Sequence, residues 1–276
     1  MIKMDARNSL RLGMVMSVLF IVACNGPESA TDAAVTSEVP AEQAPPDLSG
    51  YYMITFDAIP PLRDANAEEQ AFLEGLDPDA ILLGDTGLPE FDPGEYGGLT
   101  MLPDAIAAAR DYDPEQIRTV ANTCKPPGLI YSMQGPFGME FFQGKDLIVI
   151  KMEYYDQFRV IFMNENSHPD DWPLSNMGHS YGYWDGDTLV VETAKLRPST
   201  LFNNGVDHSE NIRVHERFRL SSDGSVLMVT QEFEDPDVFA GRAARLLPLL
   251  KDDDRVLPYD CDPSYGIDIN QRELVE

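Results

Sequence analysis

The sequence predicts a mainly β protein, built as an antiparallel up-and-down barrel or a strongly curved sheet, with a small helical and loop-rich N-terminal appendage. From residue 129 onward, short β runs follow one another at close spacing. Turn signals such as Asp185-Gly186 and Asp223-Gly224 separate them, which is typical of antiparallel hairpins. No internal repeat of 20 to 50 residues is visible, so a propeller is not expected.

The first 23 residues predict a lipoprotein signal peptide. The leader carries three basic residues, Lys3, Arg7 and Arg11. The apolar run at 12–23 is shorter than the roughly 20 residues that a membrane-spanning helix needs. It ends in Ile-Val-Ala-Cys at 21–24, which resembles the lipobox of bacterial lipoproteins. The resemblance implies cleavage before Cys24 and lipidation of that cysteine; a soluble secreted protein with a chance cysteine is the alternative.

Residues 24–48 predict a disordered, acidic and Pro-rich tether, because they show no apolar periodicity and bury too little surface to offset the entropy of ordering. By the same lipobox resemblance, Asn25 favours the outer membrane over other parts of the bacterial cell envelope. The membrane, reached through the lipid anchor, is therefore the first expected partner.

The charge of the chain argues against nucleic acid as a partner. The formal net charge is -27, and removal of the leader, which carries +2, takes the mature chain to -29. Such a charge repels phosphate backbones and anionic membrane surfaces. The sequence does not indicate an oligomeric state.

Residues 49–123 predict a strand, a loop and short helices. "SGYYMITFDA" reads as a first strand. "ANAEEQAFLEGL" and "LPDAIAAARDY" have helical composition, and Pro103 suits a helix start. A Gly- and Pro-rich loop separates the two helical stretches.

Residues 124–263 predict a lipocalin/calycin-like barrel domain, followed by a C-terminal tail at 264–276. The expected strands are 129–133, 139–143, 147–155, 158–164, 179–184, 188–193, 211–220, 225–234 and a possible ninth at 244–250. Eight or nine successive antiparallel strands suit a barrel.

Residues 178–182, Gly-His-Ser-Tyr-Gly, match the nucleophile elbow of serine hydrolases literally. An elbow needs a buried strand before the serine and a helix after it, and neither is present. A two-residue loop at Asp185-Gly186 would place His179 opposite Glu192. Alternation then puts His179 and Ser180 on opposite faces, so we interpret the stretch as a hairpin arm and not as an elbow.

Glu216 is the most unusual candidate for chemistry. It shares the period-two apolar face of its strand with Val214 and Phe218. A carboxylate there is costly unless it is paired, for instance with Arg159. The alternative is an inward general acid or base in a ligand cavity, working with His208 or His179.

The remaining candidates line the same segment of the chain. The candidate ligand-binding residues are Tyr181, Tyr183, Asp187, Arg159 and Arg217. The spacing of the histidines matches no metal signature, and His215 lies on an arginine-rich face that reads as solvated. We therefore expect neither a metal site nor a cofactor. With Cys24 lipidated, Cys124 and Cys261 are expected to form a disulfide in an oxidising compartment.

Several motifs in order resemble a family of uncharacterised secreted bacterial proteins. They are "CKPPG" (124–128), "HP" (168–169), "GHSYGYWDGDTLVVET" (178–193), "GVDHSENIRVHERF" (205–218), "DP" (235–236) and "YDC" (259–261). The resemblance covers roughly residues 46–263 and implies a shared framework of Asp187, His208, Glu216 and Arg217 with a Cys124–Cys261 pair. It implies no activity, and this chain departs from the family pattern at 164–166 and in the loop at 196–204.

Three functions remain open at this point. The favoured one is an envelope lipoprotein whose barrel binds a small apolar or amphipathic molecule, through aromatic side chains of the kind that line barrel cavities. The second is an envelope enzyme, an isomerase, hydratase/lyase or hydrolase, that uses inward Glu216 and a nearby histidine. The third is a structural or partner-binding lipoprotein without a small-molecule site.

Overall fold

The structure is a computed structural model that describes residues 44–55, 73, 75–83, 91–92, 94–110, 112, 124–202 and 204–262. These residues belong to one compact unit that begins at Ala44. The predicted signal peptide, Cys24, most of the tether, most of the first helical stretch and the C-terminal tail lie outside the described residues. Within the described part of the chain, no helix is long and apolar enough to cross a membrane.

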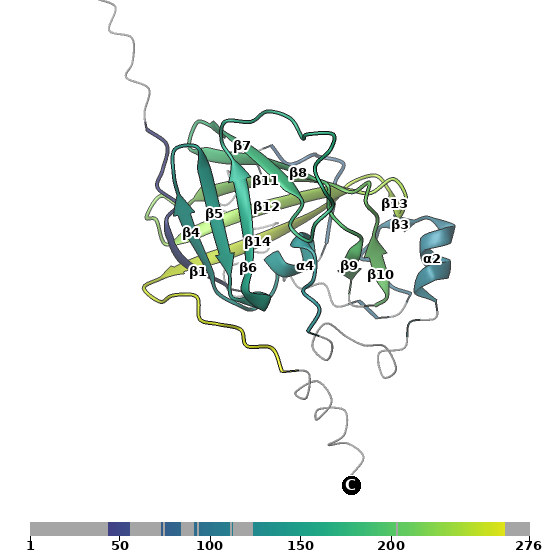
Figure 1. Cartoon of the computed structure of the whole chain (residues 1–276). Coiled ribbons are helices and arrows are strands. Elements are labelled where there is room, and N and C mark those ends of the chain that lie inside the picture. Colours follow the sequence, from purple (N-terminus) through teal and green to yellow (C-terminus); the bar gives the residue numbers. More distant parts are fainter. Residues whose placement is uncertain are drawn as a thin grey trace, which may run out of the picture. The chain divides into compact units, whose positions relative to one another are not determined.

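Nine strands close into a β-barrel (Figure 1). Their order around the barrel is β1 (Gly50–Ile54), β4 (Met139–Gln143), β5 (Leu147–Met152), β6 (Gln157–Phe162), β7 (His179–Asp185), β8 (Thr188–Ala194), β11 (Arg213–Leu220), β12 (Val226–Glu234) and β14 (Ala243–Asp252), which pairs back to β1. The predicted mainly β barrel is confirmed. β1, which the sequence placed with the N-terminal appendage, is one of the nine strands.

The barrel contains one parallel pair of strands. A closed barrel with an odd number of strands cannot be antiparallel throughout, because directions must alternate around the ring. Here β6 and β7 run parallel, with Ile161 opposite Ser180. Parallel neighbours need a crossover of a dozen or more residues, and residues 163–178 provide it. The expectation of successive antiparallel strands is wrong at this pair.

The run 129–133, predicted as a strand, is instead the short helix α4 (Leu129–Met133). Four of its five residues are buried, and a short apolar run does not distinguish a buried strand from a buried helical turn. The predicted helix at Pro103 is confirmed as α2 (Pro103–Ala109), with the proline in its first turn.

The hairpin of β7 and β8 turns at Gly186-Asp187, one residue later than predicted. Asp185 pairs with Thr188, and His179 therefore faces Ala194 instead of Glu192. Gly186 has a φ of +63°, a left-handed conformation that glycine adopts without steric cost. The predicted alternation is confirmed, since a shift of the turn by one residue leaves the two faces of β7 unchanged.

The inner faces of the strands form one hydrophobic core. The buried rings of Tyr52, Phe141 and Phe218 contact one another in sequence, with centroid distances of 5.2 and 6.2 Å. Trp184 packs against the same core from β7. Aromatic side chains of the protein itself therefore fill this part of the barrel.

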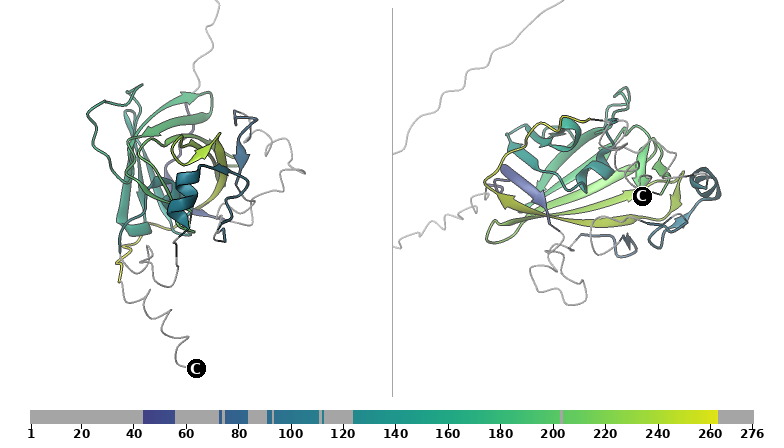
Figure 2. Two further views of the ribbon diagram at one scale, coloured as in Figure 1. Left: turned by 90° about the vertical axis from the view of Figure 1, so that its right-hand side faces the viewer. Right: turned by 90° about the horizontal axis from the view of Figure 1, so that it is seen from below.

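Smaller elements lie beyond one end of the barrel (Figures 1 and 2). They are the hairpin of β9 (Ser199–Phe202) and β10 (Val206–His208), the pair β3 (Thr100–Met101) and β13 (Phe239–Ala240), and α2. β2 (Ile81–Leu82) pairs in parallel with the start of β14. The 3-10 turn at Tyr154–Asp156 joins β5 to β6.

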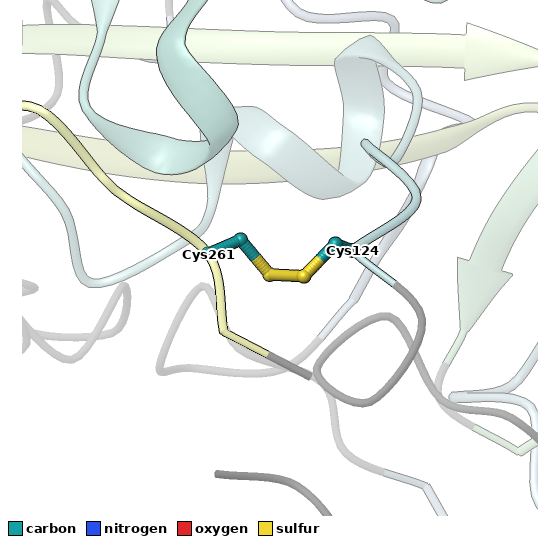
Figure 3. Close-up of a disulfide and its surroundings, with 2 residues drawn as sticks. All are labelled: Cys124 and Cys261. Atoms are coloured by element: carbon teal, nitrogen blue, oxygen red, sulfur yellow. A yellow bond between two sulfur atoms is a disulfide. The ribbon is translucent and has the colours of Figure 1, made fainter. Parts of the chain in front are cut away.

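The predicted disulfide between Cys124 and Cys261 is confirmed (Figure 3). It ties the segment before α4 to the chain that follows β14. A backbone hydrogen bond of 2.9 Å from Gly128 N to the Ser199 hydroxyl further joins the start of α4 to β9.

Candidate functional site

The barrel interior contains a closed polar network around Arg159 on β6. Its guanidinium forms an ion pair with Glu216 on β11, and both side chains have no exposed surface. Arg159 Nη1 donates to Glu216 Oε1 at 3.2 Å, and Nη2 donates to Thr193 Oγ1 at 2.9 Å. Gln231 Nε2 donates to the same Glu216 oxygen at 2.9 Å. The interpretation of Glu216 as a buried ion pair with Arg159 is confirmed.

Ser180 belongs to this inner network and not to a catalytic dyad. Its Oγ accepts from Arg159 Nε at 3.3 Å and lies 2.7 Å from Thr193 Oγ1. The neighbouring His179 makes its hydrogen bonds on the outside of the barrel. Ser180 therefore positions an arginine inside the barrel. This agrees with the interpretation of residues 178–182 as a hairpin arm and not as a nucleophile elbow.

On the outer face, one register row carries four polar side chains, which we call the outer row. Tyr181 on β7 pairs with Glu192 on β8, Glu192 with His215 on β11, and His215 with Glu232 on β12. Each residue is one position from an inward-facing neighbour, so the row lies outside the barrel wall. The outer row thus places a phenol, two carboxylates and an imidazole side by side.

Glu192 holds the ring of His215. His215 Nδ1 and Glu192 Oε1 are 2.7 Å apart, and this hydrogen bond is the main cause that raises the pKa of His215. Burial acts in the opposite direction, and the charges of Glu192 and Glu232 add to the increase. With Nδ1 bonded to a carboxylate, Nε2 is the ring atom available to a ligand.

Arg242 closes the other end of the outer row. Its Nη1 lies 3.5 Å from Glu232 and 3.4 Å from Asp77, and its Nη2 lies 3.2 Å from Glu234. Asp77 also donates its backbone N–H to Glu232 at 3.3 Å. These contacts bring the segment that precedes β2 over the outer faces of β11 and β12.

A cleft of about 450 Å³ lies between this segment and the barrel wall. Its charged lining residues are Asp77, Glu192, Arg213, His215, Glu232, Glu234 and Arg242, and its apolar ones include Leu76 and Pro78. Arg213 Nη1 donates to the carbonyls of Asn211 and Ile212, and within the described part of the chain it has no carboxylate partner. The charged lining of the cleft thus consists of four carboxylates, two arginines and His215. Arg213 and Nε2 of His215 are the groups in it that no described carboxylate holds, and they lie beside an apolar edge.

Two histidines contact each other beside the outer row. His168 lies in the crossover between β6 and β7, and His179 begins β7. His179 Nε2 is 3.0 Å from Glu165 Oε2, and its Nδ1 is 2.9 Å from His168 Nδ1. Because a carboxylate accepts only, His179 donates from Nε2 to Glu165, and one proton lies between the two Nδ1 atoms of the histidines. The ring of His168 also lies 4.9 Å from that of Tyr181.

The crossover buries this pair between aromatic rings. Phe162 stacks on His179 at 5.1 Å, and Trp172 contacts it edge-on at 4.5 Å. Burial lowers the pKa of His168 to about 4, with a further contribution from the charge of His179. His168 is therefore a neutral imidazole at neutral pH.

The structure separates the other predicted site residues from this cluster. Asp187 and Arg217 lie at the turn end of the β7–β8 hairpin, where Arg217 pairs with Asp185 at 3.4 Å and Asp187 with Arg219 at 3.6 Å. Tyr183 is exposed on the outer face.

His208 is buried on β10, and its Nδ1 donates to the carbonyl of Ser209 at 2.9 Å. No hydrogen bond joins Glu216 to His179 or His208 among the described residues.

Sequence reasoning missed the residues that line the cleft. Glu192, Glu232, Arg242 and Asp77 were not predicted as site residues, and His215 was interpreted as a solvated residue. The sequence pattern that could have indicated them is alternation, because Glu192 and His215 lie at outward positions of their strands. Their contact depends on the pairing of β8 with β11, which are separated in the chain by residues 195–212. Among the described residues, no group of three or more His, Cys, Asp or Glu side chains is arranged to hold a metal ion.

Comparison of the chain with protein-family models and with curated proteins finds no match.

Proposed function

We propose that this protein is a lipid-anchored binding protein of the bacterial envelope, and that its barrel holds a small amphipathic acid in the outer cleft. The observation that carries the proposal is the cleft itself, in which Arg213 and His215 have hydrogen-bonding capacity that the described residues do not use. The carboxylate of such a ligand would accept from Arg213 and from Nε2 of protonated His215. Its apolar part would lie against Leu76 and Pro78.

Packing favours the outer cleft over the barrel interior as the binding site. The contacts of Tyr52, Phe141 and Phe218 occupy the interior with the protein's own rings. The polar groups around Glu216 are bonded to one another. An apolar ligand in the interior would have to displace these contacts, whereas the outer cleft is already open.

The binding proposal is tested by equilibrium dialysis of the purified full chain against an extract of small molecules, followed by mass spectrometry. We expect the wild type to retain an amphipathic carboxylic acid. The double variant Arg213→Gln, His215→Gln should lose it, while Arg219→Gln on the same strand should keep it. Equal retention by the double variant, or no retained acid at all, would contradict the proposal.

The lipid anchor supports the envelope location and has its own test. Cys24→Ala removes the acylated side chain, and we expect the protein to move from the membrane fraction to the soluble fraction. Two or more acyl chains anchor stably because each buried CH₂ contributes about 0.8 kcal/mol. Membrane association that survives the substitution would contradict this part of the proposal.

Acid–base catalysis in the same cleft is the second candidate, and the Glu192–His215 contact favours it. A carboxylate that orients one ring nitrogen leaves the other as a general base, which is a common catalytic arrangement. The test is incubation of the same extract with wild type, Glu192→Gln and His215→Gln. A compound consumed by the wild type and spared by His215→Gln would establish catalysis, and retention without consumption would leave binding alone.

A further inference from the structure

A second arginine, Arg245, is buried in the barrel, and no described carboxylate contacts it. Arg245 on β14 has no exposed surface. Its Nε and Nη1 have no hydrogen-bond partner, and its Nη2 makes one long contact of 3.5 Å with the carbonyl of Leu201. A buried guanidinium with two N–H-bearing atoms unsatisfied is costly unless something accepts from them.

Arg159, in the same interior, has hydrogen-bond acceptors for its guanidinium. Its strand is separated from β14 by β7, β8, β11 and β12 on one side of the barrel, and it bonds to Glu216, Ser180 and Thr193. The described residues include two fully buried arginines, Arg159 and Arg245, and two fully buried carboxylates. Arg159 holds Glu216, whereas Asp235 accepts from Ser209 and from the backbone N–H of Asp237. No ion pair or hydrogen bond joins Asp235 to Arg245 among the described residues, so Arg245 lacks the carboxylate contact that Arg159 has.

The groups around Arg245 do not supply that counter-charge. The rings of Phe202 and Phe233 lie 5.5 and 5.3 Å from its guanidinium carbon. Its cross-strand neighbour is Gln231, whose Oε1 has no partner although its Nε2 is bonded to Glu216. Glu216 itself lies one strand further on, about 10 Å away at the usual strand spacing.

In the described part of the chain, the elements at this end of the barrel also contribute no carboxylate to Arg245. β9 provides Leu201 and Phe202, and Tyr131 of α4 is the titratable group whose charge acts on the arginine. Burial lowers the pKa of Arg245 to about 9, which still leaves it charged at neutral pH. At neutral pH a cation thus lies between two aromatic rings, with two of its nitrogen atoms lacking a hydrogen-bond acceptor.

We infer that Arg245 is the centre of a buried anion site, which takes a halide or a carboxylate-sized anion at the free N–H groups of its guanidinium, beside Gln231. The anion balances the second interior arginine as Glu216 balances the first. This site is separate from the outer cleft and does not depend on the function proposed for it. Its occupant stabilises the folded chain, because the anion binds the native state and not the unfolded one.

Bromide identifies the site directly. Crystals of the full chain soaked in sodium bromide should give an anomalous peak in contact with the Arg245 guanidinium. The inference would be overturned if the soaked crystals showed well-occupied water molecules, and no bromide, at Nε and Nη1 of Arg245.

Thermal unfolding provides the matched measurement in solution. At constant ionic strength, replacement of gluconate by chloride or formate should raise the Tm of the wild type and of Arg213→Met. The same replacement should leave the Tm of Arg245→Met unchanged. Arg245→Lys keeps the charge and should retain a reduced response, which serves if the methionine variant does not fold. An equal anion response in wild type and both Arg245 variants would overturn the inference, as would a crystal peak without any response in solution.

Discussion

The two faces of β11 and β12 place nearly identical residue types in opposite situations. His215 and Glu232 lie on the outer face, while the adjacent Glu216 and Gln231 lie on the inner face. Inside, Glu216 is fully buried and bonded to Arg159 and Gln231. Outside, 28% of the His215 side chain and 36% of its partner Glu192 remain exposed, beside an open cleft.

The two sides of the barrel wall thus separate the fully buried Glu216 from the partly exposed Glu192 and His215. The inner carboxylate is held by groups that cannot reach solvent, so it specifies the packing of the barrel. The outer carboxylate holds a histidine that can exchange protons with water. Adjacent residues in one strand therefore lie in two environments, a fully buried ion pair and the wall of an open cleft.

The largest expected effect comes from the removal of one carboxylate from each face. Glu216→Gln leaves Arg159 buried without its counter-charge, and loss of one member of a buried pair costs about 3–5 kcal/mol. Glu192→Gln removes an acid that is partly exposed, where a pair is worth about 0.2–1 kcal/mol. Urea unfolding of both variants measures the two costs. Equal losses of unfolding free energy would show that the inner network does not stabilise the fold as its burial indicates.

The inner face was largely predictable from the sequence, because period two is a local property. It places Glu216 between Val214 and Phe218, and it assigns Ser180 and His179 to opposite faces of their strand. Arg159 was named as one example of a partner for Glu216, because a buried carboxylate needs a cation, and an arginine from another strand was the alternative. The barrel class followed from the number and spacing of the β runs.

The outer site was not predictable, because it depends on which strands become neighbours. Glu192 meets His215 only when β8 pairs with β11 across the β9–β10 hairpin. The single-residue error in the β7–β8 turn was enough to pair His179 with the wrong residue. The run containing Arg245 was predicted as a strand, but no local pattern distinguishes a buried arginine without a partner from an exposed one.

Ser180→Ala removes one acceptor from the inner network, and its expected loss of unfolding free energy lies between those of Glu216→Gln and Glu192→Gln. The hydroxyl accepts from a buried guanidinium, and a hydrogen bond to a charged group contributes about 1.5–3 kcal/mol. We expect a loss of that order in urea unfolding. We also expect no labelling of wild-type Ser180 by a fluorophosphonate probe, because the serine is buried and has no histidine partner. Labelling at Ser180 would contradict its structural role.

The pH dependence of stability is expected to differ between His215 and His168. The pKa of His215 is raised in the folded state, chiefly by Glu192. Its contribution to stability is therefore fully present below the unfolded pKa of 6.5 and is lost as pH rises through the folded pKa. Unfolding free energies measured between pH 5 and 9 should show a larger cost of His215→Gln on the acidic side. A cost that is constant over this range would contradict the raised pKa.

His168 should behave in the opposite way. Burial lowers its pKa to about 4, so its contribution is present above pH 6.5 and is lost as pH falls from 6.5 toward 4. His168→Gln should therefore reduce the acid sensitivity of the wild type in that window. Chemical shifts of the imidazole protons give the same pKa independently, and titration of His168 near pH 6.5 would contradict its burial between Tyr181 and His179.

The smallest effect is expected at the exposed turn of the β7–β8 hairpin. Arg217 and Asp185 are 3.4 Å apart, but 63% of the Asp185 side chain is exposed, so water and salt screen the pair. Asp185→Asn should change the unfolding free energy by about 0.2–1 kcal/mol, with the lower values at high salt. Urea unfolding at low and high sodium chloride checks this, with Glu216→Gln as the salt-insensitive reference. A large and salt-independent loss at Asp185 would mean that the turn, and not the inner network, sets the register of β7 and β8.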